Sequence, residues 1–141
     1  MNAVLESGLK FWWLLCIHHN GQHTQMFQRK IFVRWKPLLW FVKGTKISEH
    51  VKSFSDFIES TPTNKIYHKW QQSTTEAEYI INHLTLKNQT IFDAFLGSGS
   101  SALASLKLGR KFIGIEKDPQ VFKIAKQRVT SFHHSSSVKR S

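Results

Sequence analysis

The feature that most constrains this fold is a glycine-rich turn that joins an apolar run to a helical pattern. The run covers residues 90–96 and leads into Gly97-Ser98-Gly99, after which a helix is predicted from about Ser100 to Leu108. Glycine can adopt positive φ, so the chain can reverse from a strand into a helix, and a ligand can approach the backbone.

A second strand and a second helix follow the turn. Gly109 suits the position just past the first helix, and residues 112–115 form another short apolar run. Asp118 can cap a further helix, which Pro119 opens and which runs to about residue 129. Residues 90–129 therefore predict a βαβ unit whose strands are parallel and joined by a right-handed crossover.

The amino-terminal part contains two more apolar runs, 11–17 and 38–42, with the length of buried strands. Four tryptophans in or beside them are expected to pack in the core: Trp12, Trp13, Trp35 and Trp40. Residues 46–65 are polar and predict a linker, with a helical turn near 54–58. A helix should begin at Ser73, because Glu76 lies three residues later, as in a capping box.

The charge of the chain favours a polyanionic partner such as DNA. Lys and Arg total 20 against nine Asp and Glu, which gives a net charge of +11. A solvated basic face is the simpler alternative. The single cysteine, Cys16, cannot form an internal disulfide or a paired metal site, so we expect a reducing, cytoplasmic environment and no metal. The run 11–17 is too short to cross a bilayer, so no membrane partner is expected.

The turn and the next strand together suggest a nucleoside-containing ligand. The amino terminus of the helix offers unpaired N–H groups to a polar or anionic group. Glu116 ends the next strand, where a carboxylate can accept hydrogen bonds from both hydroxyls of a ribose. The segment Gly97–Ala102 also fits the dinucleotide pattern G-x-G-x-x-A, and a tight turn without a ligand is a third interpretation.

Three segments, in order, resemble motifs of the DNA amino-methyltransferases, which methylate N6 of adenine or N4 of cytosine. The first resembles the family's D-P-F-x-G-S-G motif and is Asp93-Ala94-Phe95-Leu96-Gly97-Ser98-Gly99. Residues 109–119 resemble the family segment G-R-x-F-I-G-I-E-x-D-P, and 68–73 resemble its H-x-W-E-Q-S element. Residues 35–44 resemble the strand that precedes that element.

The resemblance implies a role for each matching residue. The backbone around Phe95, Gly97, Ser98 and Gly99 would cradle the amino-acid end of S-adenosylmethionine. Asp93 would fix the turn and hold the ammonium group, and Glu116 would bind the ribose hydroxyls. The upstream element would close over the methionine carboxylate through His68, Gln71, Gln72 and Ser73.

The resemblance also shows what these residues lack. The family's catalytic motif is D/N/S-P-P-Y/F/W, whose aromatic ring stacks on the flipped target base. The prolines here are Pro37, Pro62 and Pro119, and no Pro-Pro pair occurs. We therefore assign no catalytic residue and expect a separate chain to supply the motif and the target-recognition region.

The expected fold is an incomplete α/β, Rossmann-like S-adenosylmethionine-dependent methyltransferase fold. Residues 1–45 would be the terminal strands of the sheet, 46–65 a linker, 66–130 the cofactor-binding βαβ unit, and 131–141 a disordered tail. The central catalytic strands would be missing, which would leave two sheet edges exposed.

Two other functions stay open at this point. The chain could be a non-enzymatic DNA-binding remnant, as the missing motif suggests. It could also be a dinucleotide-binding module, although the segment 68–73 argues against that function.

Overall fold

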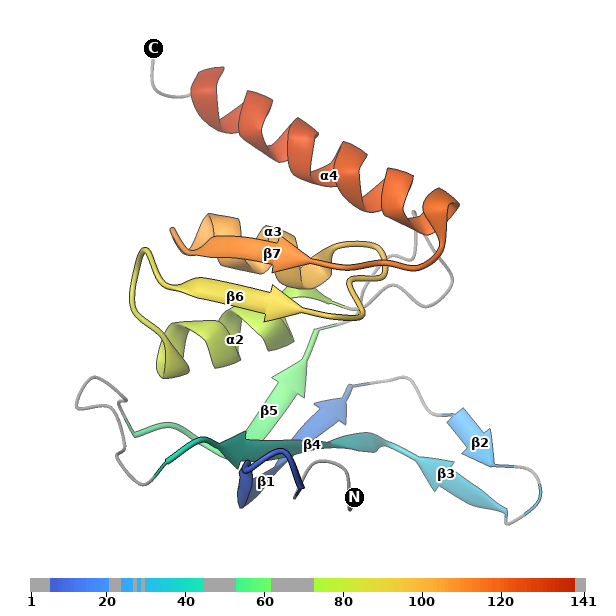
Figure 1. The fold of residues 1–141 in the computed structure, drawn as a ribbon. Helices are drawn as coiled ribbons and strands as arrows, with labels where there is room; N and C mark the ends of the chain where they lie inside the picture. The colour runs from blue at the N-terminus through green and yellow to red at the C-terminus, as the bar shows by residue number, and fades with distance from the viewer. Residues whose placement is uncertain are drawn as a thin grey trace. The chain divides into compact units, whose positions relative to one another are not determined.

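A computed structural model describes residues 6–20, 24–26, 28, 30–44, 53–61 and 73–138. The chain divides into a first unit, Met1–Pro62, and a second unit, Thr63–Ser141. Each unit is described by itself (Figure 1). Within the described ranges, no helix is long and apolar enough to span a membrane.

The first unit is organised around β1, Lys10–His19. β1 pairs antiparallel with β4, Trp35–Val42, and parallel with β5, Phe57–Ser60, which gives the strand order β4-β1-β5. A separate hairpin joins β2, Thr24–Met26, to β3, Ile31–Val33. Pro37 lies within β4, a tolerable position because β4 is at the edge of this three-stranded sheet.

The core of the first unit is formed at one end of β1. Leu15 and Ile17 on β1 and Ile58 on β5 are all buried. The other end of β1 is different, since Phe11 and Leu14 are exposed by 52% and 42%. Residues 11–17 therefore form a strand, as predicted, but only the second half of this run is buried.

The prediction that the tryptophans pack in the core is wrong for three of them. Trp12, Trp13 and Trp35 are exposed by 49%, 54% and 46%, whereas Trp40 is partly buried and its ring lies 5.8 Å from that of Phe54. The reason is the sheet geometry: strand side chains alternate between two faces, and a continuous apolar run places apolar groups on both.

The structure also corrects the predicted linker at 46–65. Residues 57–60 are strand β5, not part of a helical turn near 54–58. β5 is held by pairing with β1 and by Asp56, whose carbonyl accepts the N–H of Cys16 at 2.7 Å. The carboxylate of Asp56 accepts the indole N–H of Trp13 at 2.9 Å. These partners lie some 40 residues away, so the local sequence pattern did not indicate them.

The second unit contains the predicted βαβ arrangement. Its elements are α2, Thr74–Leu84; β6, Thr90–Asp93; α3, Ser100–Lys107; β7, Lys111–Gly114; and α4, Pro119–Val138. β6 and β7 are parallel, as predicted, with Phe92 opposite Ile113. Helix α3 packs on β7 and against α2 (Figure 1).

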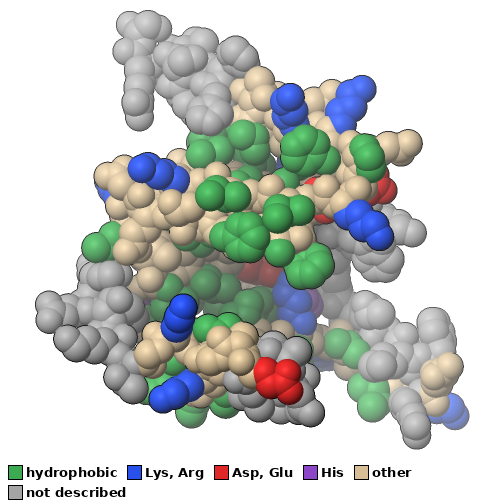
Figure 2. Space-filling model, viewed as in Figure 1, with side chains coloured by type: hydrophobic (Ala, Val, Ile, Leu, Met, Phe, Trp, Pro, Cys, Tyr) green, Lys and Arg blue, Asp and Glu red, His purple; other side chains and the backbone are tan. Residues whose placement is uncertain are grey.

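The two faces of the β6–β7 pair differ in exposure. Ile91 and Phe112 are partly buried, whereas Phe92 and Ile113, one position along on each strand, are exposed by 60% and 57%. Figure 2 shows apolar side chains gathered on the visible face of this region. Parallel strands are normally covered on both faces, so this pair has the exposed apolar surface expected of an incomplete sheet.

Two predicted boundaries shift in the second unit. The first strand ends at Asp93, and residues 94–99 form the turn. The predicted disordered tail at 131–141 is wrong over most of its length, because α4 continues to Val138. No Gly or Pro follows Pro119, so nothing in the sequence interrupts the helix. The remaining predicted tail, 139–141, lies outside the described residues.

Candidate functional site

The glycine turn, residues 94–99, is fixed by Asp93 at the end of β6. One carboxylate oxygen of Asp93 accepts the backbone N–H of Phe95 at 2.9 Å. The other oxygen accepts the hydroxyl of Ser101 in the first turn of α3 at 2.5 Å. Asp93 therefore joins the end of the strand, the turn and the start of the helix. This contact agrees with the predicted turn-fixing role, and its predicted contact with an ammonium group stays a prediction.

The backbone of the turn uses conformations that favour glycine. Gly97 and Gly99 have φ of 55° and 84°. The N–H of Gly99 donates to the carbonyl of Leu96 at 3.0 Å, which closes the turn just before α3. Phe95 is exposed by 90%, so its side chain adds little to packing while its backbone is held by Asp93. The turn thus presents backbone at the carboxyl end of β6, where a ligand can approach.

Glu116 lies two residues beyond β7 and contacts the turn directly. One carboxylate oxygen accepts the N–H of Gly97 at 2.8 Å, and the other accepts the N–H of Asp118 at 2.9 Å. These bonds from Asp118 and Gly97 hold the pKa of Glu116 below its ordinary value. The carboxylate is therefore ionised at neutral pH and lies beside the turn, as parallel strands predict.

The start of α4 forms the rim next to Glu116. The carboxylate of Asp118 accepts the N–H groups of Gln120 at 2.8 Å and Val121 at 3.3 Å, so Asp118 is the predicted N-cap. An open depression is lined here by Glu116, Lys117, Asp118, Pro119 and Gln120. Glu116 therefore lines an open depression next to the turn.

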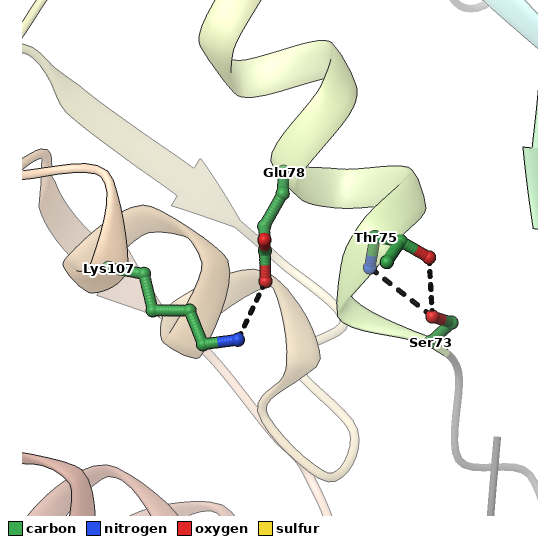
Figure 3. A network of polar contacts seen from close by, with 4 residues as sticks. All are labelled: Ser73, Thr75, Glu78 and Lys107. Carbon is green, nitrogen blue, oxygen red and sulfur yellow. Dashed lines mark hydrogen bonds and ion pairs between the residues drawn. The ribbon is translucent and has the colours of Figure 1, made fainter. Parts of the chain in front are cut away.

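The upstream element is only partly visible. His68, Gln71 and Gln72 lie outside the described residues. The Ser73 hydroxyl accepts the N–H of Thr75 at 3.2 Å and lies 2.6 Å from the Thr75 hydroxyl, so Ser73 is the N-cap of α2 (Figure 3). Its predicted contact with the methionine carboxylate stays a prediction.

Two side chains connect α2 with the carboxyl end of α3, at the far end of α3 from the turn. The ammonium group of Lys107 on α3 forms an ion pair with the carboxylate of Glu78 on α2, with 2.8 Å between nitrogen and oxygen; the pair is drawn in Figure 3. The buried guanidinium of Arg110 donates to the carbonyl of Leu108 at 2.6 Å and to the carbonyl of Thr85 at 2.5 Å. Arg110 thereby satisfies one carbonyl at the carboxyl end of α2 and one at the carboxyl end of α3.

Sequence reasoning missed Ser98 as a buried residue and missed the contact that it makes. Ser98 is only 7% exposed, and its partner, Arg128, lies 30 residues further on, in α4. Ala125, on the same helix, is only 1% exposed. Arg128 had no local signal, because a lone arginine on a helix usually faces solvent.

Comparison with known proteins gives concordant matches. A family model described as "DNA methylase" matches residues 3–127. The type II methyltransferase M.BglI of Bacillus subtilis is 30% identical over 84% of this chain and 35% of its own. The type II methyltransferase M2.LlaDCHI of Lactococcus lactis subsp. cremoris is 34% identical over 65% of this chain and 40% of its own. The chain thus spans well under half of these curated relatives.

Solved structures give the same fold. The M1.HpyAVI–SAM complex matches 91% of this chain and 66% of its own, with a TM-score of 0.73 and 26% identity. The PvuII DNA methyltransferase, described as cytosine-N4-specific, matches 90% of this chain with a TM-score of 0.70 and 18% identity. These matches confirm the predicted α/β, Rossmann-like class, present here in part.

Proposed function

The chain belongs to the DNA methylase family, whose cofactor is S-adenosylmethionine, and we propose that its second unit is the cofactor-binding portion of a DNA methyltransferase. The methyl group would go to adenine N6 or cytosine N4. The observation that carries the proposal is the bond between Glu116 and the N–H of Gly97. It brings the acidic group and the glycine turn to one edge of a parallel strand pair, where nucleotide ligands bind in open α/β sheets.

The two parts of the site suit the two ends of the cofactor. The turn and the amino terminus of α3 offer backbone groups to the polar amino-acid end. The two oxygens of Glu116 each accept one N–H, and a carboxylate has about four acceptor positions, so each oxygen can also accept a ribose hydroxyl. The similarity to the solved M1.HpyAVI–SAM complex, at 26% identity, supports the proposal that this chain binds the same cofactor.

Mechanistically, this chain's residues bind and orient the cofactor. The sulfonium methyl group would be presented to a base held by another polypeptide segment, and the transfer would be direct, so the contribution here is positioning. Residues 1–141 contain no Pro-Pro pair, so a D/N/S-P-P-Y/F/W group that holds the target amino group would have to come from outside them. We propose that these residues alone do not methylate DNA and that a separate segment or chain completes the enzyme.

DNA is the proposed substrate, and the charge of the chain supports it. The net charge of +11 would draw the phosphate backbone, which positions a duplex without reading its sequence. Binding of a nonspecific duplex should then weaken steeply as salt rises, in proportion to the number of phosphates neutralised. Salt-independent DNA binding would contradict this part of the proposal.

The test is calorimetric titration of S-adenosylmethionine into the purified chain and into Glu116→Gln. The substitution removes the negative charge and one of the two oxygens that would accept hydrogen bonds from the ribose hydroxyls, so the affinity should fall by about tenfold or more. Glu78→Gln is the matched control, since it removes a carboxylate from α2 whose partner is Lys107. Equal affinity in both variants, or no binding by a folded wild-type chain, would contradict the proposed site.

A further inference from the structure

Helix α4 is attached to the glycine turn by Arg128. One guanidinium nitrogen of Arg128 donates to the backbone carbonyl of Ser98, and the same nitrogen lies 3.1 Å from the Ser98 hydroxyl. The contact joins positions 30 residues apart in the sequence. Because Ser98 is only 7% exposed, the bond is made largely away from water.

A second contact from α4 lies one helical turn earlier. A Cβ placed on Gly99 would lie 3.2 Å from the Ala125 Cβ and 3.3 Å from its Cα. Ala125 is 1% exposed. Residues three apart share one face of a helix, so Ala125 and Arg128 support adjacent residues of the turn from the same side.

Together these contacts hold one peptide group at both ends. The peptide between Ser98 and Gly99 has its carbonyl bound by Arg128 and its N–H bound by the carbonyl of Leu96. The preceding glycine, Gly97, is held through its N–H by Glu116. A turn rich in glycine would otherwise sample many conformations, since glycine loses the most backbone entropy on ordering.

We propose that Arg128 is a positioning residue for S-adenosylmethionine, and this inference rests on the proposed function. Arg128 does not contact the cofactor; it fixes the orientation of the Ser98–Gly99 peptide, so the backbone that receives the amino-acid end is ordered before binding. Preorganisation of this kind raises affinity by reducing the ordering cost. The ribose end, held by Glu116, does not depend on Arg128.

The experiment compares two ligands on the full chain. S-adenosylmethionine has the amino-acid end, and 5′-methylthioadenosine lacks it. Arg128→Gln should weaken S-adenosylmethionine by about tenfold, the equivalent of one charge-assisted hydrogen bond, and change 5′-methylthioadenosine by less than about twofold. Arg128→Lys keeps the charge and loses the planar fork, so its S-adenosylmethionine affinity should lie between those of the wild type and Arg128→Gln.

Lys126→Gln is the matched control, because it removes one positive charge from an exposed position of the same helix. It should bind both ligands as the wild type does. An unchanged S-adenosylmethionine affinity in Arg128→Gln would overturn the inference. An equal loss of both ligands would overturn it too, since Arg128 would then support the unit as a whole.

A ligand-free measurement separates this inference from the proposed function. If the wild type binds neither ligand, the proposed function fails for this chain, and amide hydrogen exchange then decides the role of Arg128. The amides of Gly97 and Gly99 should exchange about tenfold faster in Arg128→Gln than in Lys126→Gln, with β6 and β7 unchanged. Equal exchange at the turn in both variants would overturn the inference.

Discussion

In the second unit, side chains from the end of β6, from the segment after β7 and from α4 converge on one short turn, whereas in the first unit a single strand, β1, organises the sheet by backbone pairing. The turn is held by Asp93, by Glu116 and by Arg128. β1 is buried at Leu15 and Ile17, yet exposes Phe11 to Leu14. The polar contacts of the second unit therefore specify one backbone conformation, while the first unit depends on burial at one end of its strand.

The difference suggests where each unit tolerates change. A turn fixed by several directed bonds should lose function when any bond or close contact is altered. A sheet with one buried end should be sensitive only there. Paired substitutions, each placing the same chemical change at a supported and an unsupported position, test this comparison.

The largest effect is expected within β1 itself. Leu15→Ala removes a side chain that is 1% exposed and should lower the free energy of unfolding by about 2–5 kcal/mol. Leu14→Ala, at a neighbouring position that is 42% exposed, should cost under about 1 kcal/mol. Urea denaturation of both variants measures the difference. Equal losses would mean that the exposed end of β1 is covered in solution.

The next effect contrasts two glycines with nearly the same backbone. Gly99 and Gly44 have φ of 84° and 82°, so alanine is strained at both by about 1–2 kcal/mol. A Cβ on Gly44 would meet nothing within 4 Å, but on Gly99 it would press on Ala125. Gly99→Ala should therefore cost about 1–3 kcal/mol more than Gly44→Ala and weaken S-adenosylmethionine binding strongly. The thermal unfolding and the cofactor titration of the two variants check this, and indistinguishable variants would refute the packing of α4 on the turn.

A smaller effect comes from the protonation of Glu116. Its pKa is lowered by the N–H groups of Asp118 and Gly97. The ionised carboxylate therefore stabilises the folded state in full above the pKa of an unfolded glutamate. This stabilisation is lost as the pH falls through the lower, folded pKa. S-adenosylmethionine affinity should therefore stay constant from neutral pH into the mildly acidic range and then fall by about tenfold. The pH profile of Glu116→Gln should lack this step; an identical profile in the variant would remove Glu116 from the site.

The smallest effect is expected on the open face of the β6–β7 pair. Phe92→Ser, at a position 60% exposed, should change the free energy of unfolding by less than about 0.5 kcal/mol. Ile91→Ser, on the partly buried opposite face, should cost about 1–3 kcal/mol. Equilibrium unfolding measures both variants. If Phe92→Ser lowers the free energy of unfolding as much as Ile91→Ser does, another surface covers the Phe92 face in solution.

The same comparison explains what the sequence could and could not predict. The turn, the Asp118 cap and the parallel pair depend on signals that lie close together: glycines after an apolar run, and Asp before Pro119. β5 depends on pairing with β1, and the β2–β3 hairpin has only three residues on each strand, so neither has a local pattern. Tertiary pairing decides such segments.

The arrangement of the candidate site residues was predicted to a similar extent. Asp93, Gly97, Gly99 and Glu116 lie together as expected, because the ends of parallel strands meet at one edge of the sheet. Arg128 was missed, since its partner is 30 residues away and a helical arginine gives no sign of its contact. The burial of Glu76, at 6% exposure, was likewise hidden by its charge.

The central claim is that the glycine turn and Glu116 form one cofactor site. The most direct measurement is a backbone-amide NMR titration of the chain with S-adenosylmethionine. The account predicts saturable shifts at the backbone amides of Gly97, Ser98 and Gly99 and of Lys117 and Asp118. Saturable binding that shifts amides elsewhere and leaves these five unchanged would contradict it.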